Sequence, residues 1–319
     1  MENQKETIRV RVPASSANLG PGFDTLGIAL QLYSYVSVEA SPTNQNEVVM
    51  QGEGSEYGQI PIEENIAWQA IVQLARRLKS TFPPLRLTVE NSIPLARGLG
   101  SSAAARVGAI VATNLWLQRV GENYLDQQGL LELATELEGH PDNVASALFG
   151  GMTASVCDEG KVLSSPVNTK FWPQFLVFIP STELETKTAR GVLPESVSRH
   201  DAIYNVSRLG LLVATLGSGT WQNNSQLLKT ALQDKLHQPY RASLMPAFDA
   251  VQNAALENGA LGVTLSGAGP SILIWLEVGA KSTFKESVKS IILQTATMNG
   301  VLGEVIELEV DTQGCVMDD

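Results

Sequence analysis

The chain has 319 residues, of which 44% are apolar and 17% charged, a composition typical of a globular protein that buries a core. Its 33 acidic residues outnumber its 22 basic residues, and the net charge of −11 argues against a broad nucleic-acid-binding surface. No segment approaches the roughly 18 unbroken apolar residues of a membrane helix. The first residues also lack the apolar core of a signal peptide, so we expect a cytoplasmic protein without membrane contact.

Alternating apolar residues predict strands at residues 8–12, 30–40 and 85–89. Asn65 is placed to cap a helix that continues to about Lys79. The apolar residues that would form the buried face of this helix are Ile66, Ala70, Ile71, Leu74 and Leu78.

Three helices are predicted after the strand at 85–89. The first runs from 101 to about 117, and the second covers about 126–137, ahead of Gly139. Pro141 is suited to the first turn of a short third helix, which ends at a glycine pair at 150–151. Residues 152–157 then predict a strand.

Strands and helices also mix in the second half. Its predicted segments are a buried strand at 174–180, a mostly helical stretch at 181–260 with a turn at 216–224, two strands around a glycine turn at 261–278, a helix near 281–295 and a strand near 303–310. Both halves therefore predict an α+β protein of two lobes. The boundary falls within 160–172, and we divide the chain into residues 1–165 and 166–319.

Residues that form disulfides or bind metals are sparse. Cys157 and Cys315 belong to no CxxC pair, so we expect free thiols. The three histidines are too scattered to indicate a metal cluster.

Residues 94–104 read PLARGLGSSAA, and they place two glycines and two serines between a strand and an alanine-rich helix. Glycines let backbone N–H groups approach a ligand closely, and the first turn of a helix carries free donors and a partial positive charge. The segment therefore fits a phosphate-binding loop, although no GK[ST] follows. A tight turn with serine caps explains the local pattern equally well.

Four motifs, taken together, give a more specific interpretation. PASSANLGPGFD at 13–24, GLGSSAA at 98–104, HPDN at 140–143 and SGAGPS at 266–271 resemble, in this order and spacing, the GHMP kinase superfamily. Within it they are similar to the branch that phosphorylates L-homoserine. The resemblance implies an N-terminal ATP-binding lobe, a C-terminal ferredoxin-like lobe, and transfer of phosphate from ATP to the homoserine hydroxyl with Mg²⁺. The product would be O-phospho-L-homoserine, on the route to threonine.

The resemblance implies an ATP site on the glycine loop, with a wall supplied by Gly267 and its neighbours Ser266 and Gly269. Asn65 either approaches the adenine or only caps its helix, and we favour the cap. The Arg97 side chain either touches the nucleotide or lies in solvent, and we favour solvent. The loop residues carried over are Pro94, Leu95, Ala96, Arg97, Gly98, Leu99, Gly100, Ser101, Ser102, Ala103 and Ala104.

The implied Mg²⁺ ligands are Ser102 and Glu132, with Glu136 and Glu138 as nearby competitors. Mg²⁺ prefers oxygen ligands and keeps several waters, so one hydroxyl, one carboxylate and phosphate oxygens suffice. Taken alone, a helical glutamate such as Glu132 more often carries a solvated surface charge.

The resemblance assigns the amino-acid substrate to both lobes. Asn18 and Asp24 would contact it, with the Asp24 carboxylate facing its ammonium group, although both residues also suit a loop that bonds its own backbone. His140 would contact substrate or cap the helix after it. Arg190 and Arg241 would bind the substrate carboxylate, which a guanidinium holds in a bidentate manner.

The implied catalytic residues are Asn143, Thr186 and Arg190. Asn143 would lie near the transferred group, at a position where other superfamily members are expected to use an aspartate base. Thr186, one helical turn before Arg190, would lie near the reacting hydroxyl. Phosphoryl transfer tolerates a missing base, because its loose transition state depends mainly on positioning and charge neutralisation.

Two rival functions remain at this point. The first is a kinase of the same superfamily that acts on an isoprenoid or a sugar, and the second is a nucleotide-binding regulatory protein without turnover. The partners expected are L-homoserine and ATP, without nucleic acid or membrane, and the resemblance is compatible with a homodimer.

Overall fold

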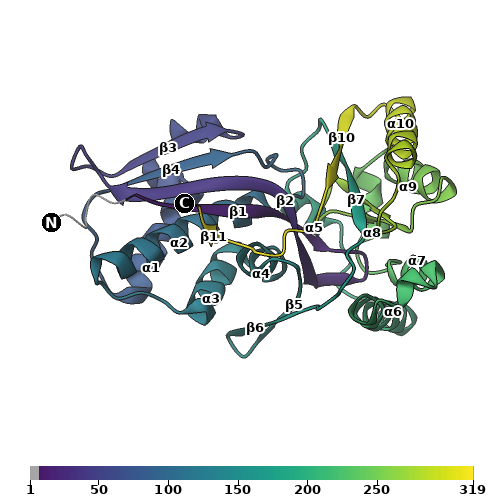
Figure 1. Ribbon diagram of the computed structural model, residues 1–319, viewed down its shortest axis with the longest axis horizontal. Coiled ribbons are helices and arrows are strands. Elements are labelled where there is room, and N and C mark those ends of the chain that lie inside the picture. The colour runs from purple at the N-terminus through teal and green to yellow at the C-terminus, as the bar shows by residue number, and fades with distance from the viewer. Residues whose placement is uncertain (1–6, 319) are drawn as a thin grey trace.

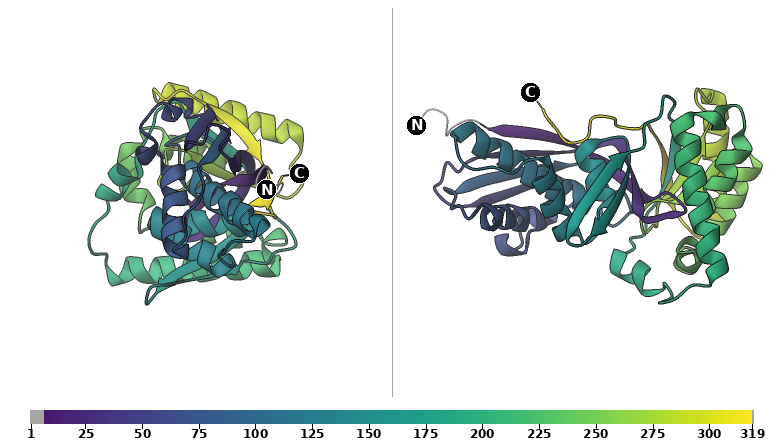
Figure 2. Two further views of the ribbon diagram at one scale, coloured as in Figure 1. Left: turned by 90° about the vertical axis from the view of Figure 1, so that its left-hand side faces the viewer. Right: turned by 90° about the horizontal axis from the view of Figure 1, so that it is seen from below.

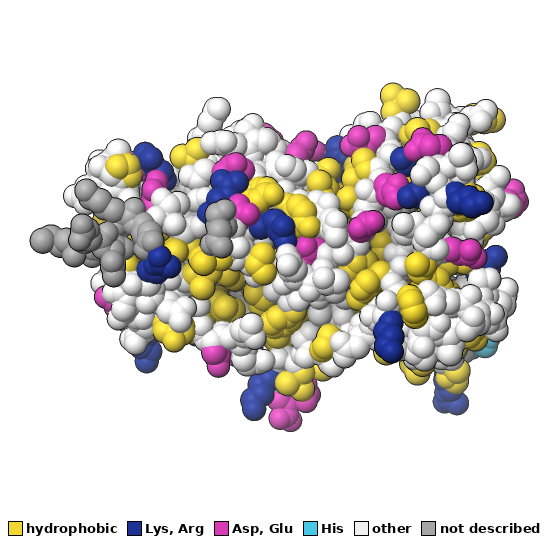
Figure 3. Space-filling model, viewed as in Figure 1, with side chains coloured by type: hydrophobic (Ala, Val, Ile, Leu, Met, Phe, Trp, Pro, Cys, Tyr) yellow, Lys and Arg dark blue, Asp and Glu magenta, His cyan; other side chains and the backbone are white. Residues whose placement is uncertain are grey.

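The computed structural model describes residues 7–318, which form two lobes side by side along the long axis (Figure 1, Figure 2). Each lobe consists of a sheet covered by helices, so the α+β two-lobed architecture predicted from the sequence is confirmed. Within the described residues, no helix has the length and apolar character needed to cross a membrane. On the face shown in Figure 3, acidic and basic side chains are interspersed over both lobes.

The first lobe contains a sheet in the order β11-β1-β2-β4-β3, to which β5 adds by pairing with β2 and β6 by pairing with β5. Only β3 and β4 pair in parallel; the other described pairs are antiparallel. The strands are β1 Ile8–Asn18, β2 Gly22–Ala40, β3 Glu47–Gly52, β4 Leu85–Asn91, β5 Met152–Asp158, β6 Lys161–Pro166 and β11 Val316–Met317.

Four helices cover one face of this sheet: α1 Ile66–Leu78, α2 Ser101–Val120, α3 Gln127–Glu138 and α4 Asp142–Phe149. Helix α2 lies at the centre and contacts β1, β2 and the other three helices, so most of its residues are buried. Gly108 lets it approach the sheet, since a Cβ there would lie 2.5 Å from Val36 Cγ2. The alanine-rich sequence of α2 therefore reflects close packing on several sides.

The segment at 13–30 differs from the glycine-rich loop that its composition suggests. Residues 13–18 end β1, and β2 begins at Gly22, with irregular register between Pro13 and Ala14 and between Ala17 and Asn18. Small side chains are needed here because helix α4 crosses closely: a Cβ at Gly27 would lie 2.0 Å from the carbonyl oxygen of Asp142. This part of β2 is thus buried on both faces. Its sequence therefore lacks the alternation of apolar and polar residues that identifies a half-exposed strand.

The second lobe has an antiparallel sheet in the order β10-β7-β9-β8. Its strands alternate with helices as βαββαβ, the ferredoxin-like arrangement expected from the resemblance. The elements are β7 Gln174–Pro180, α5 Thr186–Gly191, α6 Arg199–Ser218, α7 Ser225–Ala231, α8 Gln238–Arg241, α9 Phe248–Glu257, β8 Gly262–Leu265, β9 Ile272–Leu276, α10 Ser282–Met298 and β10 Gly303–Leu308. The described residues of the two lobes also contain short 3₁₀ turns at Ser55–Gly58, Ile62–Glu64, Thr220–Gln222 and Ala242–Leu244.

Strand β7 is buried on both faces, which explains its uninterrupted apolar sequence. Leu176 and Phe178 belong to the apolar cluster formed with α9 and α10. Phe175 and Val177 face the other way and join the main core together with residues of α6. The sheet of the second lobe therefore carries helices on both sides.

Several expectations needed correction at the ends of elements. The short strands β3, β6 and β11 were not predicted, and α6 continues to Ser218 through the expected turn start at 216. Ile66 is 37% exposed and does not belong to the buried face of α1. After β10 the chain returns to the first lobe, where β11 pairs with β1. The division of the chain at 165/166 stays a prediction.

Candidate active site

A cavity of about 370 Å³ lies between the lobes, within the size range of small-molecule sites. The strand ends, helix starts and turns that line it come from both halves of the chain. The predicted site residues on its wall are Asn18, Asp24, Asn65, Pro94, Leu95, Ala96, Arg97, Gly98, Leu99, Gly100, Ser101, Ser102, His140, Asn143, Thr186, Arg190, Arg241 and Gly267.

The glycine loop depends on two left-handed residues, Gly98 with φ 74° and Gly100 with φ 71°. A Cβ on Gly98 would lie 2.2 Å from the Ser266 carbonyl oxygen, and one on Gly100 would lie 2.0 Å from Ser15 Oγ. Only glycine fits both the backbone conformation and the space. Helix α2 begins directly after Gly100, so the unpaired N–H groups of its first turn face the cavity edge, where they favour an anion.

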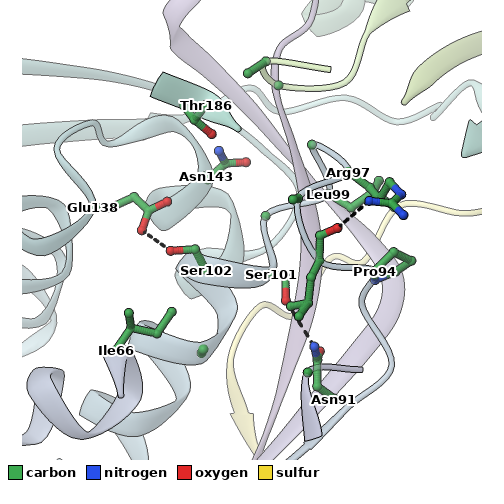
Figure 4. Close-up of a pocket in the computed structure, with 18 of the residues that line it drawn as sticks. Ile66, Asn91, Pro94, Arg97, Leu99, Ser101, Ser102, Glu138, Asn143 and Thr186 are labelled. Atoms are coloured by element: carbon green, nitrogen blue, oxygen red, sulfur yellow. Dashed lines mark hydrogen bonds between the residues drawn. The ribbon is translucent and has the colours of Figure 1, made fainter. Parts of the chain in front are cut away.

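Side chains fix the serines at the start of α2 (Figure 4). Asn91 Nδ2 donates to Ser101 Oγ over 3.1 Å. Ser102 Oγ donates to Glu138 Oε2 over 3.0 Å, and the Arg106 guanidinium bonds both Ser102 and Glu138. A hydroxyl and a carboxylate therefore meet beside the loop, and a cation already balances the carboxylate charge.

The start of α4 forms a second polar group in the cavity. The Asp142 side chain is buried; its Oδ1 accepts from the Asn143 N–H over 2.7 Å and lies 2.8 Å from His140 Nδ1. Asn143 Oδ1 accepts from Ser15 Oγ over 2.9 Å. Burial lowers the pKa of His140, but the hydrogen bond with Asp142 and nearby negative charges outweigh it, so the pKa lies above its ordinary value.

A carboxylate and two guanidinium groups also line the cavity. Arg190 on α5 donates to both oxygens of Asp24 over 2.9 and 2.6 Å. Arg241 at the end of α8 is buried and donates to the carbonyl oxygens of Ala189 and Gly267 over 3.1 and 3.2 Å. Burial, together with the charge of Arg190, lowers the pKa of Arg241 to about 10.

Two family patterns match the chain: the GHMP kinases N terminal domain over residues 65–151 and the GHMP kinases C terminal region over residues 212–290. A homoserine kinase of Desulfitobacterium hafniense is 42% identical over 313 residues, which cover 97% of this chain and 99% of that protein. The chain belongs to the homoserine kinases of the GHMP kinase family. A homoserine kinase of Nostoc punctiforme is 43% identical over 96% of this chain and 97% of its own. The crystal structure of homoserine kinase from Cytophaga hutchinsonii, 28% identical, matches 98% of both chains with a TM-score of 0.85.

The homoserine kinase motifs converge on the cavity, but the acidic residue beside Ser102 differs from the one expected. Glu132 lies outside the cavity and its Oε1 accepts from Gln128 Nε2 over 2.9 Å. Glu138 takes the expected place. The two residues are six positions apart on α3, which turns their side chains by roughly 240° around the helix axis. The expectation of Glu132 at this site is therefore wrong.

Three residues of the glycine loop, Ala103, Ala104 and Arg97, lie differently from the prediction. Ala103 and Ala104 are fully buried beneath the loop and do not line the cavity. The Arg97 side chain does not extend into solvent: it donates to the carbonyl oxygens of Pro180 and Ser181 over 2.8 and 2.7 Å, at the end of β7. Figure 4 shows it on the far side of the loop from Glu138.

The side chains of Asn65 and Asn18 both form hydrogen bonds with backbone groups, as the helix-cap and loop interpretations predicted. Both residues also line the cavity. Asn65 Oδ1 accepts from the N–H groups of Ala67 and Trp68, which caps α1. Asn18 Nδ2 donates to the Gly267 carbonyl oxygen over 2.7 Å, and its Oδ1 accepts from the Asp24 N–H over 2.9 Å. Asn18 thus joins the segment at 13–24 to the SGAGPS turn.

Sequence reasoning missed Arg106, Phe23 and Ser15. Arg106 lies four residues after Ser102 on α2, so helical spacing alone places both on one face. Phe23 is next to Asp24, and its ring centroid lies 5.6 and 5.3 Å from the guanidinium carbons of Arg190 and Arg241. Ser15 gave no signal, because only the fold brings it to Asn143.

Proposed function

We propose that the protein transfers the γ-phosphoryl group of ATP to the hydroxyl of L-homoserine and forms O-phospho-L-homoserine. One observation carries the proposal: a single cavity holds the glycine loop at the start of α2 and, beside it, Asp24, Arg190 and Arg241. The first group suits a triphosphate, and the second offers both signs of charge to a zwitterionic amino alcohol. The names of the relatives support the same substrate.

The charged groups would exchange partners when substrate binds. Asp24 and Arg190 form a bidentate pair with side chains about one third exposed, 35% and 36%. A zwitterion brings an ammonium group for Asp24 and a carboxylate for the arginines, so no charge would be left unpaired. A neutral alcohol would offer no charge to replace the Asp24–Arg190 pair, and a purely anionic alcohol would offer none to Asp24, so either would gain less binding free energy.

Positioning would supply most of the rate, because the carboxylate beside Asn143 is not free to act as a strict base. The Asp142 carboxylate is already bonded by Asn143 and His140. Asn143 and Thr186 both line the cavity and are drawn above Ser102 in Figure 4, where they would orient the substrate hydroxyl. The N–H groups around Gly98–Ser102 would offset the charge that spreads over the phosphate oxygens.

The residues beside the loop fit Mg²⁺. Ser102 Oγ and the Glu138 carboxylate are hard oxygen donors within hydrogen-bond distance of each other. The Arg106 guanidinium, which bonds both, would have to move aside, and phosphate oxygens and waters would then complete an octahedral shell. We therefore assign the Mg²⁺ site to Ser102 and Glu138. The ion, when bound, would neutralise part of the triphosphate charge.

The substrate is tested by coupled ADP release with homoserine, mevalonate and galactose. We expect turnover with homoserine; preference for mevalonate or galactose would refute the assignment and favour the isoprenoid or sugar kinase. A regulator without turnover would release no ADP with any of them. The homodimer and the cytoplasmic location stay predictions, which light scattering after size exclusion and cell fractionation measure.

The metal site is tested with a matched pair of variants on α3. Glu138→Gln should lower kcat by about 100-fold or more and raise the Mg²⁺ concentration needed for half-maximal rate. Glu132→Gln, on the outer side of the same helix, should change neither quantity. If the rate of the Glu138→Gln enzyme depended on Mg²⁺ concentration as the rate of the unaltered enzyme does, Glu138 would not belong to the proposed site.

A further inference from the structure

His237 is the most enclosed titratable group near the cavity, although it does not line it. Its side chain is completely buried at the start of α8, one helical turn before Arg241. Asp234 fixes this start, because its Oδ2 accepts from the N–H groups of His237 and Gln238 over 3.0 and 2.6 Å. Asn205 Nδ2 holds the other oxygen of Asp234 over 2.8 Å. The imidazole therefore has little freedom to rotate.

The neighbours of His237 define its tautomer. Nε2 lies 2.8 Å from the Gly20 carbonyl oxygen, which can only accept, so Nε2 carries the proton. Nδ1 lies 3.1 Å from Arg241 Nη1, which can only donate, so Nδ1 carries a lone pair. Asp234 Oδ2 is 3.6 Å from Nε2, too far for a hydrogen bond. A protonated ring would lose the bond to Arg241 and oppose its charge.

The charged groups around the ring agree with a neutral imidazole. Burial lowers the pKa of His237, Arg241 lowers it further, and Asp234 and Asp24 only partly oppose this. The ring also stacks on Phe23 with centroids 5.3 Å apart and an angle of 24° between planes. Phe23 directly precedes Asp24. The His237 ring therefore contacts both the segment that carries Asp24 and the guanidinium of Arg241.

We propose that His237 is a positioning residue for substrate binding, which aims the Arg241 guanidinium through its Nδ1 lone pair and holds the Gly20–Asp24 segment through its Nε2–H. Arg241 has two other acceptors, the carbonyl oxygens of Ala189 and Gly267. Three fixed acceptors determine the plane of a guanidinium, and the remaining N–H groups are left for a carboxylate. The inference rests on the proposed function, because it assigns that carboxylate to homoserine.

Two amide variants separate the two nitrogens. In His237→Asn, the amide oxygen overlays Nδ1 and still accepts from Arg241, whereas the bond to Gly20 is lost. In His237→Gln, the amide nitrogen reaches the position of Nε2 and still donates to Gly20, whereas Arg241 loses its acceptor. We expect the homoserine KM to rise by about 10-fold or more in His237→Gln and by clearly less in His237→Asn. The KM for ATP should stay within about 2-fold in both.

A measurement on the unaltered protein tests the tautomer itself. With only three histidines in the chain, two-dimensional ¹H–¹⁵N spectra of the imidazoles can be assigned by comparison with the variants. We expect a neutral Nε2–H ring for His237 at neutral pH. A charged ring or an Nδ1–H tautomer overturns the proposal, and so does an equal rise of the homoserine KM in both variants. If the protein phosphorylates no homoserine at all, the proposed function fails, while the spectrum still tests the arrangement around Arg241.

Discussion

At the scale of single residues, a substitution at Gly100 tests why this position of the glycine loop excludes a side chain. A Cβ on Gly100 would meet Ser15 Oγ at 2.0 Å, and Ser15 is the residue that holds Asn143. Gly100→Ala should therefore disturb the loop and the start of α4 together. We expect the rate with saturating homoserine and ATP to fall by about 100-fold, as measured by ADP release.

The control for Gly100→Ala is Gly121→Ala at the end of α2. Gly121 has φ 81°, also left-handed, but no atom would lie within 4 Å of a Cβ there. Its replacement should cost only about 1–2 kcal/mol in the free energy of unfolding and leave the rate unchanged. Equal effects of the two substitutions on the rate would show that backbone strain, and not the contact with Ser15, explains the loss.

His140 predicts a pH dependence of stability. Its pKa is raised in the folded state, so its pair with Asp142 contributes stability that is fully present below the unfolded value of 6.5 and is lost as the pH rises through the folded value. The difference in free energy of unfolding between the protein and His140→Gln should be larger at about pH 6 than at about pH 9, in urea titrations. A difference that grows with pH would contradict the pairing.

The four motifs predicted most of the candidate site, because each motif contains the glycine, proline or polar residues that form its own turn. They did not distinguish Glu132 from Glu138, because a motif gives a neighbourhood on a helix and the direction of a side chain depends on how that helix is rotated against its neighbours. Arg97 shows the same limit. Its carbonyl partners Pro180 and Ser181 lie more than eighty residues away, and nothing near Arg97 in the sequence indicates them.

At the scale of elements, the sequence predicted helices and half-exposed strands well, and failed where a strand is buried on both faces by small residues. The start of β2 is such a case, since Gly27 lies directly under α4. Strands of two to six residues at a sheet edge, such as β11, β3 and β6, carry too few alternations to stand out from loops.

The packing of α4 on β2 predicts a large cost for Gly27→Ala. The added Cβ would lie 2.0 Å from the carbonyl oxygen of Asp142, and a helix backbone cannot move as cheaply as a side-chain end. We expect a loss of about 2–3 kcal/mol in the free energy of unfolding, together with loss of activity because His140 and Asn143 flank that carbonyl. Chemical denaturation and ADP release measure the two effects.

Gly210→Ala on α6 is the matched control. Gly210 is exposed in the middle of a helix, and a Cβ there would have no neighbour within 4 Å. The substitution should stabilise the protein by about 0.5–1 kcal/mol through helix propensity. A Gly27→Ala protein as stable as the parent would mean that α4 does not lie as closely on β2 as the structure shows.

At the scale of the whole molecule, the two lobes meet through the loop that the triphosphate would occupy. The Ala96 carbonyl oxygen accepts from the Leu184 N–H over 3.1 Å, and the Gly98 carbonyl oxygen accepts from Ser266 Oγ over 2.6 Å. Between them, the Arg97 side chain bonds the end of β7. Three successive positions of this loop are thus held by the second lobe, so the geometry of the proposed ATP site depends on how the lobes are joined.

Arg97 tests this dependence, because its side chain joins the lobes without reaching the acidic and amide groups that would handle the phosphates. Arg97→Ala removes charge-assisted bonds to the carbonyl oxygens of Leu95, Pro180 and Ser181, together with an ion pair to Glu183, and should loosen the loop. We expect the dissociation constant for ATP, measured by calorimetry, to rise by about 10-fold. Arg97→Lys should recover only part of this affinity, since an ammonium group cannot fork between two carbonyls as a guanidinium does. The exposed Arg199→Ala serves as the control for loss of one positive charge, and equal ATP affinities in all three variants would mean that the loop keeps its shape without the Arg97 side chain.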